Sequence, residues 1–202
     1  MRQAYLKDFH GQTVANLGEA DILVNNAGGR KGTADFQETG VATFRECLEF
    51  NLMSPVELIA LVLPHMREQR WGRIINISGT NARRAGNLSG GARNTSLVHL
   101  TKTLAVQLGQ FGITVNCIHP GITRTERTPG LLAARAAQLG ITPEEVERRD
   151  YDPDGSGGNS IGRMVDADEV AYVSTFLSSD KAWAVTGELI IATGGAGDSV
   201  YY

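Results

Sequence analysis

The sequence predicts an α/β fold, in which helices cover both faces of a doubly wound parallel sheet. Three observations support it: apolar runs of strand length, helical periodicity between them, and glycine at the end of each run. Continuous apolar runs are typical of strands buried on both faces, and their alternation with helices indicates βαβ units. The four candidate strands are Asp21–Ala27, Arg73–Ser78, Ile113–Ile118 and Glu188–Thr193.

The segments between these runs are predicted to be helical. Apolar residues recur at steps of three and four from Phe44 to Leu63 and again from Leu97 to Leu108, as on the buried face of a helix. Another helix is expected to open at Asp166, with carboxylates in its first turn, and to run to about Leu177.

Glycine is in excess, at 24 of 202 residues, where average usage would be about 7%. The glycines follow the candidate strands, and open α/β sheets bind ligands at the carboxyl ends of their strands. Glycine allows the backbone to approach a ligand closely. The alternative is that each glycine only terminates its strand. We favour a ligand-binding edge because all four strands share the feature.

The segment from Ile122 to Ile161 interrupts the alternation. It shows no strand signal, one short helix-like stretch at Leu131–Leu139, and a Gly/Ser-rich run over 152–160. Long loops in compact domains are usually functional or disordered. We predict one domain over 1–202, with 122–161 inserted as a substrate lid and the Gly/Ser run as its hinge. The alternative is a disordered surface insertion.

Composition excludes several classes of protein. A formal net charge of −3 without a basic stripe disfavours nucleic-acid binding. Uninterrupted apolar runs such as Leu58–Leu63 fall short of the roughly 20 residues of a membrane span. No secretion signal occurs in residues 1–20, so a cytoplasmic location is expected. Cys47 and Cys117 are interpreted as small buried apolar residues rather than a disulfide, and no metal site is predicted.

Four motifs occur in a recognisable order. They are Asn25-Asn-Ala-Gly28, Arg73-Ile-Ile-Asn-Ile-Ser78, Pro120-Gly-Ile-Thr-Arg-Thr125, and a carboxyl-terminal series from Gly162 to Gly195. This ordered set resembles the short-chain dehydrogenase/reductase family from about residue 13 to 195. The resemblance implies a Rossmann-type fold, NAD or NADP as cofactor, and hydride transfer at a carbon of a small alcohol or carbonyl substrate.

The resemblance also implies roles for individual residues. Ser78 and Asn51 are the catalytic candidates: the first at a strand end, with Thr80 as an alternative hydroxyl, the second where the family's helix bends to hold a water in a proton relay. The candidates for cofactor binding lie at strand ends, beside the adenosine ribose and sheet centre or the nicotinamide carboxamide. They are Asn25, Ala27, Gly28, Pro120, Gly121, Thr123 and Thr125.

Two family residues are missing by this alignment. Counting back from Leu100-Thr-Lys-Thr-Leu-Ala105, the family's catalytic Tyr position falls on Gly90 and its Lys position on Asn94. The Tyr is the family's general acid/base, and loss of such a group costs on the order of 10² to 10⁴ in rate. We therefore expect weakened or atypical catalysis. The alternatives are a catalytically inactive relative that binds a ligand as a sensor or regulator, or a structural partner in an oligomer.

Other side chains could replace the missing Tyr or act nearby. Ser89 adjoins Gly90, Arg93 lies on the same helix start, and Tyr151 lies in the predicted lid. His119 precedes Pro120 at the ligand edge and titrates near neutrality. For His119, bonding to backbone at a strand end is the favoured interpretation.

The start of the chain departs from the family as well. No Gly-rich turn precedes Asn25, so the fold is expected to lack its amino-terminal strand, Gly-rich turn and helix. The strand at Asp21–Ala27 would then have an unpaired apolar edge, which we expect to be covered by a longer natural chain or by a partner. The resemblance further implies a homodimer or homotetramer through helices at 44–66 and 90–108. The choice between NAD and NADP and the substrate's identity do not follow from this sequence.

Overall fold

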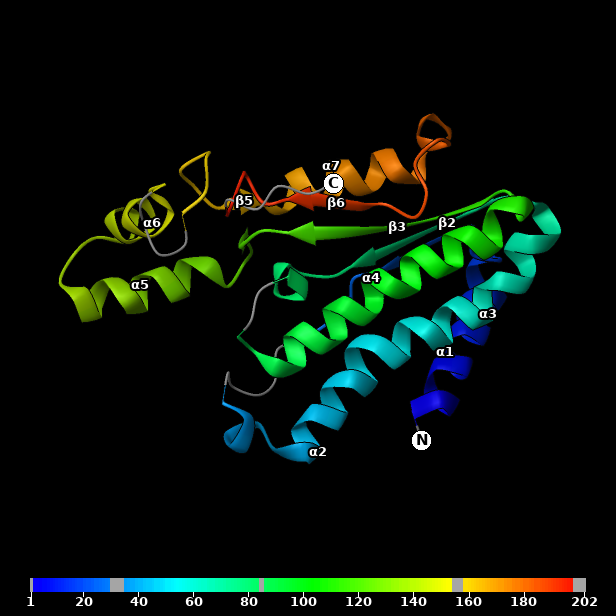
Figure 1. The fold of residues 1–202 in the computed structure, drawn as a ribbon, viewed down its shortest axis with the longest axis horizontal. Helices are drawn as coiled ribbons and strands as arrows, with labels where there is room; N and C mark the ends of the chain where they lie inside the picture. The colour runs from blue at the N-terminus through cyan, green and yellow to red at the C-terminus, as the bar shows by residue number, and fades with distance from the viewer. Residues whose placement is uncertain (1, 30–34, 84–85, 154–157, 198–202) are drawn as a thin grey trace. The chain divides into compact units, whose positions relative to one another are not determined.

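The computed structural model describes residues 2–29, 35–83, 86–153 and 158–197 (Figure 1). It confirms the α/β class. One sheet has the strand order β1-β2-β3-β6, and β2 pairs in parallel with both β1 and β3. Each expected run forms a strand: β1 is Ile22–Asn25, β2 is Gly72–Ile77, β3 is Ile113–Pro120 and β6 is Leu189–Ala192.

The helices also match the expected order, with different bounds. They are α1 (Arg2–Leu17), α2 (Phe36–Leu48), α3 (Ser54–Gln69), α4 (Leu88–Leu108), α5 (Thr128–Leu139), α6 (Pro143–Tyr151) and α7 (Ala167–Ser178). The single helix expected from Phe44 to Leu63 is interrupted by a π-helix at Glu49–Met53. Short 3-10 helices occupy Thr80–Arg83, Gly109–Phe111 and Asp180–Ala182.

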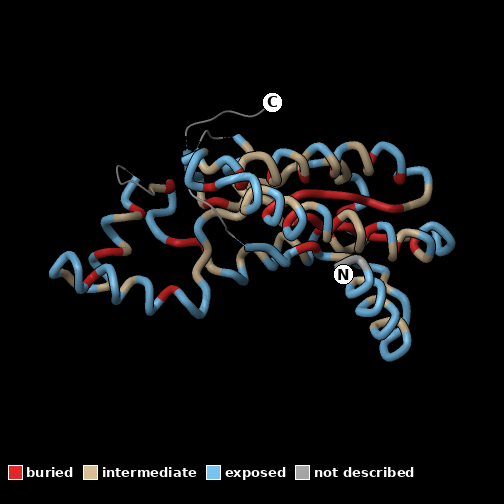
Figure 2. Tube along the Cα trace, turned by 90° about the horizontal axis from the view of Figure 1, so that it is seen from below, coloured by how far each residue is buried: buried red, intermediate tan, exposed pale blue. Residues whose placement is uncertain are grey.

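The chain divides into two compact units. Unit 1 comprises Met1–Ile118 and Ser174–Ile190, and unit 2 comprises His119–Val173 and Ile191–Tyr202. The core of unit 1 joins α3 and α4 to β2 and β3. Burial is concentrated on the central strands, whereas α1, which begins at the N label, is exposed or half-buried along its described side chains (Figure 2). The core residues are Ile59, Val62, Met66, Ile74, Ala105, Leu108, Ile113 and Val115.

A buried arginine closes the amino-terminal end of β2. The Arg73 side chain is 0% exposed, and its Nη2 donates to Oδ1 of Asp180 at 3.1 Å. Its Cζ lies 4.2 Å from the ring centroid of Trp71 and 5.4 Å from that of Trp183. Burial lowers the pKa of Arg73, and the Asp180 carboxylate opposes that shift. The two aromatic faces and the carboxylate compensate the cation for its lost hydration.

Unit 2 corrects the expectation that 122–161 contains no strand. β4 (Thr123–Arg124) pairs in parallel with β5 (Val165–Asp166). Helix α6 was not expected either, although its capping box is readable: the Thr142 hydroxyl accepts from the amide of Glu145, whose carboxylate accepts from the Thr142 amide. Residues 154–157 of the Gly/Ser run lie outside the described residues, and the lid remains a prediction.

The short lengths of the uninterrupted apolar runs do not by themselves exclude a membrane span. One helical run of the described chain, Gln37–Gln69, is long and apolar enough to cross a membrane, with a mean hydropathy of 1.5 in its most apolar window. The expectation had considered only uninterrupted apolar runs. Core helices of soluble proteins pass the same test, and Ile59, Val62 and Met66 of this run pack in the core of unit 1. The run is therefore weak evidence for a membrane span.

Candidate functional site

A cavity of about 220 Å³ lies in unit 1, at the carboxyl ends of β1 and β2. It brings together five of the predicted site residues: Asn25, Ala27, Gly28, Asn51 and Ser78. The other predicted residues, from Pro120 to Thr125, belong to unit 2. The remaining lining residues are Asn26, Gly29, Pro55, Ile77, Arg93, Asn94 and Leu97.

Asn25 anchors one wall of the cavity through a buried chain of polar groups. Its Nδ2 donates to Oδ1 of Asn76 at 2.8 Å, and Nδ2 of Asn76 donates to the Thr101 hydroxyl at 3.0 Å. The Thr101 hydroxyl donates its only proton to the carbonyl of Leu97 at 2.8 Å, so it can only accept from Asn76. This fixes which groups donate and which accept along the series of hydrogen bonds. Asn25 Oδ1 is left buried without a partner among the described residues, as an acceptor for a ligand's donor.

Asn51 lies in the π-helix, at the position where the resemblance predicts a local bend, and its role in a proton relay remains a prediction. Its Oδ1 accepts from the amide of Gly29 at 2.9 Å and from Arg93, and its Nδ2 donates to the carbonyl of Cys47 at 2.8 Å. A Cβ at Gly28 would lie 3.2 Å from Asn51 Oδ1, a tight contact that glycine avoids. π-Turns inside helices are frequent at functional sites. Here the π-helix is hydrogen-bonded, through Asn51, to Gly29 in the loop after β1.

The start of α4 supplies no acid or base at the two positions in question. Gly90 is buried, and its amide donates to the side chain of the N-cap residue Asn87 at 2.6 Å. Asn94 is 5% exposed, and its Nδ2 donates to the carbonyl of Gly79 at 3.2 Å. The Ser89 hydroxyl donates to Asn87 Oδ1 at 3.0 Å, so its proton is already engaged.

Ser78 lines the cavity as expected for a catalytic candidate, but its hydroxyl donates to the backbone carbonyl of Asn94 at 3.2 Å. A serine that polarises a substrate carbonyl must instead direct this proton to the substrate. Thr80, the alternative hydroxyl, belongs to the 3-10 helix after β2 and does not line the cavity. The catalytic role of Ser78 remains a prediction.

Arg93 is the residue whose position at the site the sequence reasoning underestimated. Its Nη1 donates to Asn51 Oδ1 and to the carbonyl of Gly29, the latter at 2.9 Å. Its Nε is buried and has no partner among the described residues. Its position next to Asn94 on a predicted helix was the available signal, but its partners come from the loop after β1 and from the π-helix.

Tyr151, a possible substitute for the missing Tyr, and the two cysteines are buried. Tyr151 is 5% exposed in unit 2, and burial raises its pKa, with Asp150 and Glu147 adding to the shift. A raised pKa moves the phenol away from the range of a general base at neutral pH. Burial also raises the pKa of Cys117 to about 12, against hydrogen bonds that lower it. Cys47 and Cys117 are free and buried, which confirms their interpretation as small core residues.

The predicted residues of unit 2 form the turn after β3. Gly121 packs so closely that a Cβ there would lie 2.9 Å from Cα of Thr193. The Thr123 hydroxyl donates to the Gly121 carbonyl at 3.0 Å, and the Thr125 amide donates to the Thr128 hydroxyl at 2.9 Å. The structure thus explains these residues, with Pro120 at the end of β3, as parts of a tight turn. Their contacts with a cofactor remain predictions.

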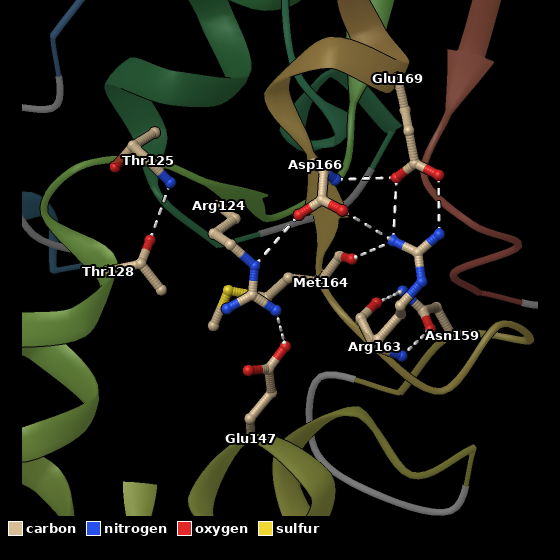
Figure 3. Close-up of polar contacts among 9 residues, drawn as sticks. All are labelled: Arg124, Thr125, Thr128, Glu147, Asn159, Arg163, Met164, Asp166 and Glu169. Atoms are coloured by element: carbon tan, nitrogen blue, oxygen red, sulfur yellow. Dashed lines mark hydrogen bonds and ion pairs between the residues drawn. The ribbon is translucent and has the colours of Figure 1, made fainter. Parts of the chain in front are cut away.

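An ion-pair network tethers this turn to the helices of unit 2 (Figure 3). Arg124 pairs with Glu147 of α6 and with Asp166 at 3.0 Å. Arg163 pairs with Glu169 at 2.7 Å, and Glu169 also accepts from the Asp166 amide at 2.8 Å. Sequence reasoning did not anticipate the network, because its members are separated by loops.

Comparison with known proteins decides the family. A family model described as Enoyl-(Acyl carrier protein) reductase, one of those for short-chain dehydrogenases/reductases, matches residues 2–197. The chain belongs to the short-chain dehydrogenase/reductase family. The Rossmann-type fold inferred from the four motifs is thereby confirmed.

Individual relatives support this assignment. The chain is 35% identical over 198 residues to L-fucose dehydrogenase of Oryctolagus cuniculus, covering 96% of this chain and 65% of that enzyme. It is 31% identical over 199 residues to D-beta-hydroxybutyrate dehydrogenase of Cupriavidus necator, covering 96% and 74%. Among solved structures, YwfH, an NADPH-dependent reductase involved in bacilysin biosynthesis, has the same fold, with a TM-score of 0.84 at 24% identity over 98% of this chain and 75% of YwfH.

Proposed function

We propose that this short-chain dehydrogenase/reductase is a nicotinamide-dependent oxidoreductase of a small alcohol or carbonyl compound, with weakened proton transfer. One observation supports this proposal most directly. A cavity lies at the carboxyl ends of β1 and β2, and neither Gly90 nor Asn94 at the start of α4 offers an acid or base. Family membership supports the redox chemistry. The names of the relatives, dehydrogenases of L-fucose and D-beta-hydroxybutyrate, support a small hydroxyl-bearing substrate.

The described residues fit part of a nicotinamide cofactor. The buried acceptor Asn25 Oδ1 can receive a hydrogen bond from a hydroxyl or amide of the cofactor. Ala27 and Gly28 keep side-chain bulk out of the cavity, and Gly28 leaves no space to spare beside Asn51. These residues would hold the cofactor, which when bound would accept or supply the hydride. We extend the proposal to Thr123 and Thr125 by family resemblance. It covers NAD and NADP alike.

The weak step in this cavity is the transfer of the proton. Oxidation of an alcohol breaks a C–H bond, whose hydride goes to the cofactor, and an O–H bond, whose proton needs an acceptor. No carboxylate, imidazole, phenol or amine is among the described lining residues. Arg93 can stabilise a developing oxyanion, but arginine side chains keep their proton in proteins. The proton therefore passes to water, and the rate falls by about 10² to 10⁴ relative to a Tyr-containing site.

The same observation favours a second candidate function. A family member without an acid/base could bind its nucleotide or a small ligand without turnover and act as a sensor or regulatory subunit. The amide side chains of Asn25, Asn51 and Asn94 provide such a cavity with hydrogen-bonding groups that need no ionisation. Measured turnover by the purified protein separates the two functions.

Restoring the two missing side chains tests the proposal. In Gly90→Tyr/Asn94→Lys, the new Cβ at position 90 would first meet side-chain ends, Asn87 Oδ1 at 2.9 Å and Asn81 Nδ2 at 3.0 Å, which can move. We expect kcat/KM with NAD(H) or NADP(H) and a panel of alcohols and ketones to rise about 10² to 10⁴-fold. The matched control is Gly90→Phe/Asn94→Lys, which has the bulk without the hydroxyl and gains nothing.

Two results would contradict this reasoning. One is a folded Tyr/Lys variant that binds the cofactor like the wild type and turns over no faster, because proton transfer would then not be the weak step. The other is an equal gain in the Phe/Lys control, which would assign the effect to packing. Absence of cofactor binding by the wild type would refute the nicotinamide-dependent function itself.

We also propose a homodimer or homotetramer through the faces of α3 and α4. Phe50 and Met53 of the π-helix are 44% and 38% exposed, and Val106 of α4 is 76% exposed. Apolar residues that are exposed on neighbouring helices commonly mark an interface. Sedimentation of wild type and Val106→Glu tests this: a wild-type monomer would refute it.

A further inference from the structure

We propose that Arg93 makes the cavity of unit 1 a binding site for a carboxylate, so that the ligand is a small hydroxy acid or oxo acid rather than a neutral alcohol. The inference rests on the proposed function for the role of this ligand as substrate. The binding site itself is argued from the charge, the hydrogen bonds and the size of the cavity.

Arg93 brings a positive charge that the cavity does not compensate. Its two hydrogen-bond acceptors, Asn51 Oδ1 and the Gly29 carbonyl, are neutral. Of the described residues that line the cavity, only Arg93 carries a formal charge. Several other arginines of the described chain pair with carboxylates, among them Arg73, Arg124, Arg135 and Arg163. A partly buried cation without a counter-charge is costly, and an anionic ligand would offset that cost.

The guanidinium is also held ready for a ligand. Nη1 donates to Asn51 of the π-helix and to Gly29 in the loop after β1, and these two bonds restrict the orientation of the side chain. Nε is buried with no partner among the described residues. Nε and the remaining Nη2 are the two donors that arginine presents side by side to a carboxylate.

The size and the remaining lining limit the ligand. The cavity of about 220 Å³ also includes the wall of Asn25, Ala27 and Gly28 that would hold the cofactor, so only the part beside Arg93 is left for the second ligand. Ile77, Pro55 and Leu97 supply an apolar wall, and Ser78 and Asn94 supply hydroxyl and amide groups. These groups suit a short carbon chain that has one carboxylate and one hydroxyl or carbonyl oxygen.

Calorimetric binding to the purified full chain tests the inference without requiring turnover. The probes are beta-hydroxybutyrate and its neutral methyl ester, with inorganic phosphate and ADP-ribose as anions of the cofactor type. The variants are Arg93→Gln and Arg93→Lys. Arg45→Gln is the matched control, because Arg45 is exposed on α2 and does not line the cavity. Circular dichroism shows that each variant is folded.

We expect the acid to bind the wild type and the Arg45 control about tenfold or more tighter than its ester, and to lose about that factor in Arg93→Gln. Arg93→Lys should recover part of the affinity, and added salt should weaken binding of the acid only. Equal binding of acid and ester, unchanged affinity in folded Arg93→Gln, or no binding of the acid would overturn the proposal. Binding of phosphate or ADP-ribose without the acid would assign the cation to the cofactor. A wild type that binds the carboxylate but shows no turnover would instead count against the proposed function.

Discussion

The polar chain beneath the cavity gives a direct prediction for stability. Asn76 is 0% exposed, accepts from Asn25 at 2.8 Å and donates to Thr101 at 3.0 Å. In Asn76→Ala both bonds are lost, at about 1 kcal/mol each, and Asn25 Nδ2 becomes a buried donor without an acceptor, at about 1–3 kcal/mol. We expect the free energy of unfolding to fall by about 3 to 5 kcal/mol.

Guanidinium unfolding followed by tryptophan fluorescence measures this loss. The two tryptophans of the chain, Trp71 and Trp183, both lie in unit 1, so their signal reports on the unit that contains Asn76. The control is Asn16→Ala on exposed α1, where the Asn16 side chain donates to the Gln12 carbonyl at 2.7 Å in water; its cost should be within about 0.5 kcal/mol. A loss below about 1 kcal/mol in Asn76→Ala, with an unchanged denaturant slope, would show that the amide chain does not stabilise the native state.

Two further predictions concern backbone strain and pH. Gly112→Ala should cost about 2–5 kcal/mol in unfolding free energy, because Gly112 has φ of +74° and a Cβ there would lie 2.0 Å from the Arg70 carbonyl oxygen. Gly109→Ala, with open space around its Cβ, should be nearly neutral; equal losses in the two variants would contradict the reasoning. The hydrogen bond from Arg163 lowers the pKa of Glu169 from its usual 4.5 to about 2. The ionised Glu169 side chain therefore contributes its full stabilisation above about pH 4.5, and this contribution is lost as the pH falls from 4.5 to about 2. The difference in Tm between wild type and Glu169→Gln should vanish towards pH 2, and a constant difference would count against the pair.

Much of the fold was predictable because its signals are local. The apolar runs of β1, β2, β3 and β6 and the glycines after them identify the strands without knowledge of their partners. Helix α6 also carried a readable capping box, but the Gly/Ser-rich run that follows it gives the wider segment the composition of a loop. The apolar character of Gln37–Gln69 did not show in the lengths of uninterrupted apolar runs, because polar residues interrupt a segment whose mean hydropathy is nevertheless high.

The candidate site was predictable by type and not by contact. Asn25, Asn51 and Ser78 were expected at one site, and they line one cavity. The partners of these side chains were not foreseeable, since Asn25 and Asn76 are 51 positions apart and meet only through strand register. The assignment of the family's Tyr and Lys positions to Gly90 and Asn94 rests on spacing within one helix and remains a prediction.

The sequence by itself determined the strands and the family, because local periodicity and motif order require no knowledge of long-range contacts. Tertiary structure alone decided that Arg93 contacts Asn51 and Gly29, and that none of the described residues lining the cavity carries a charge opposite to that of Arg93. It also decided that Arg73 is enclosed by Trp71 and Trp183. The physical reason is that burial and charge compensation depend on which distant segments pack together, and no spacing along the chain encodes those distances directly.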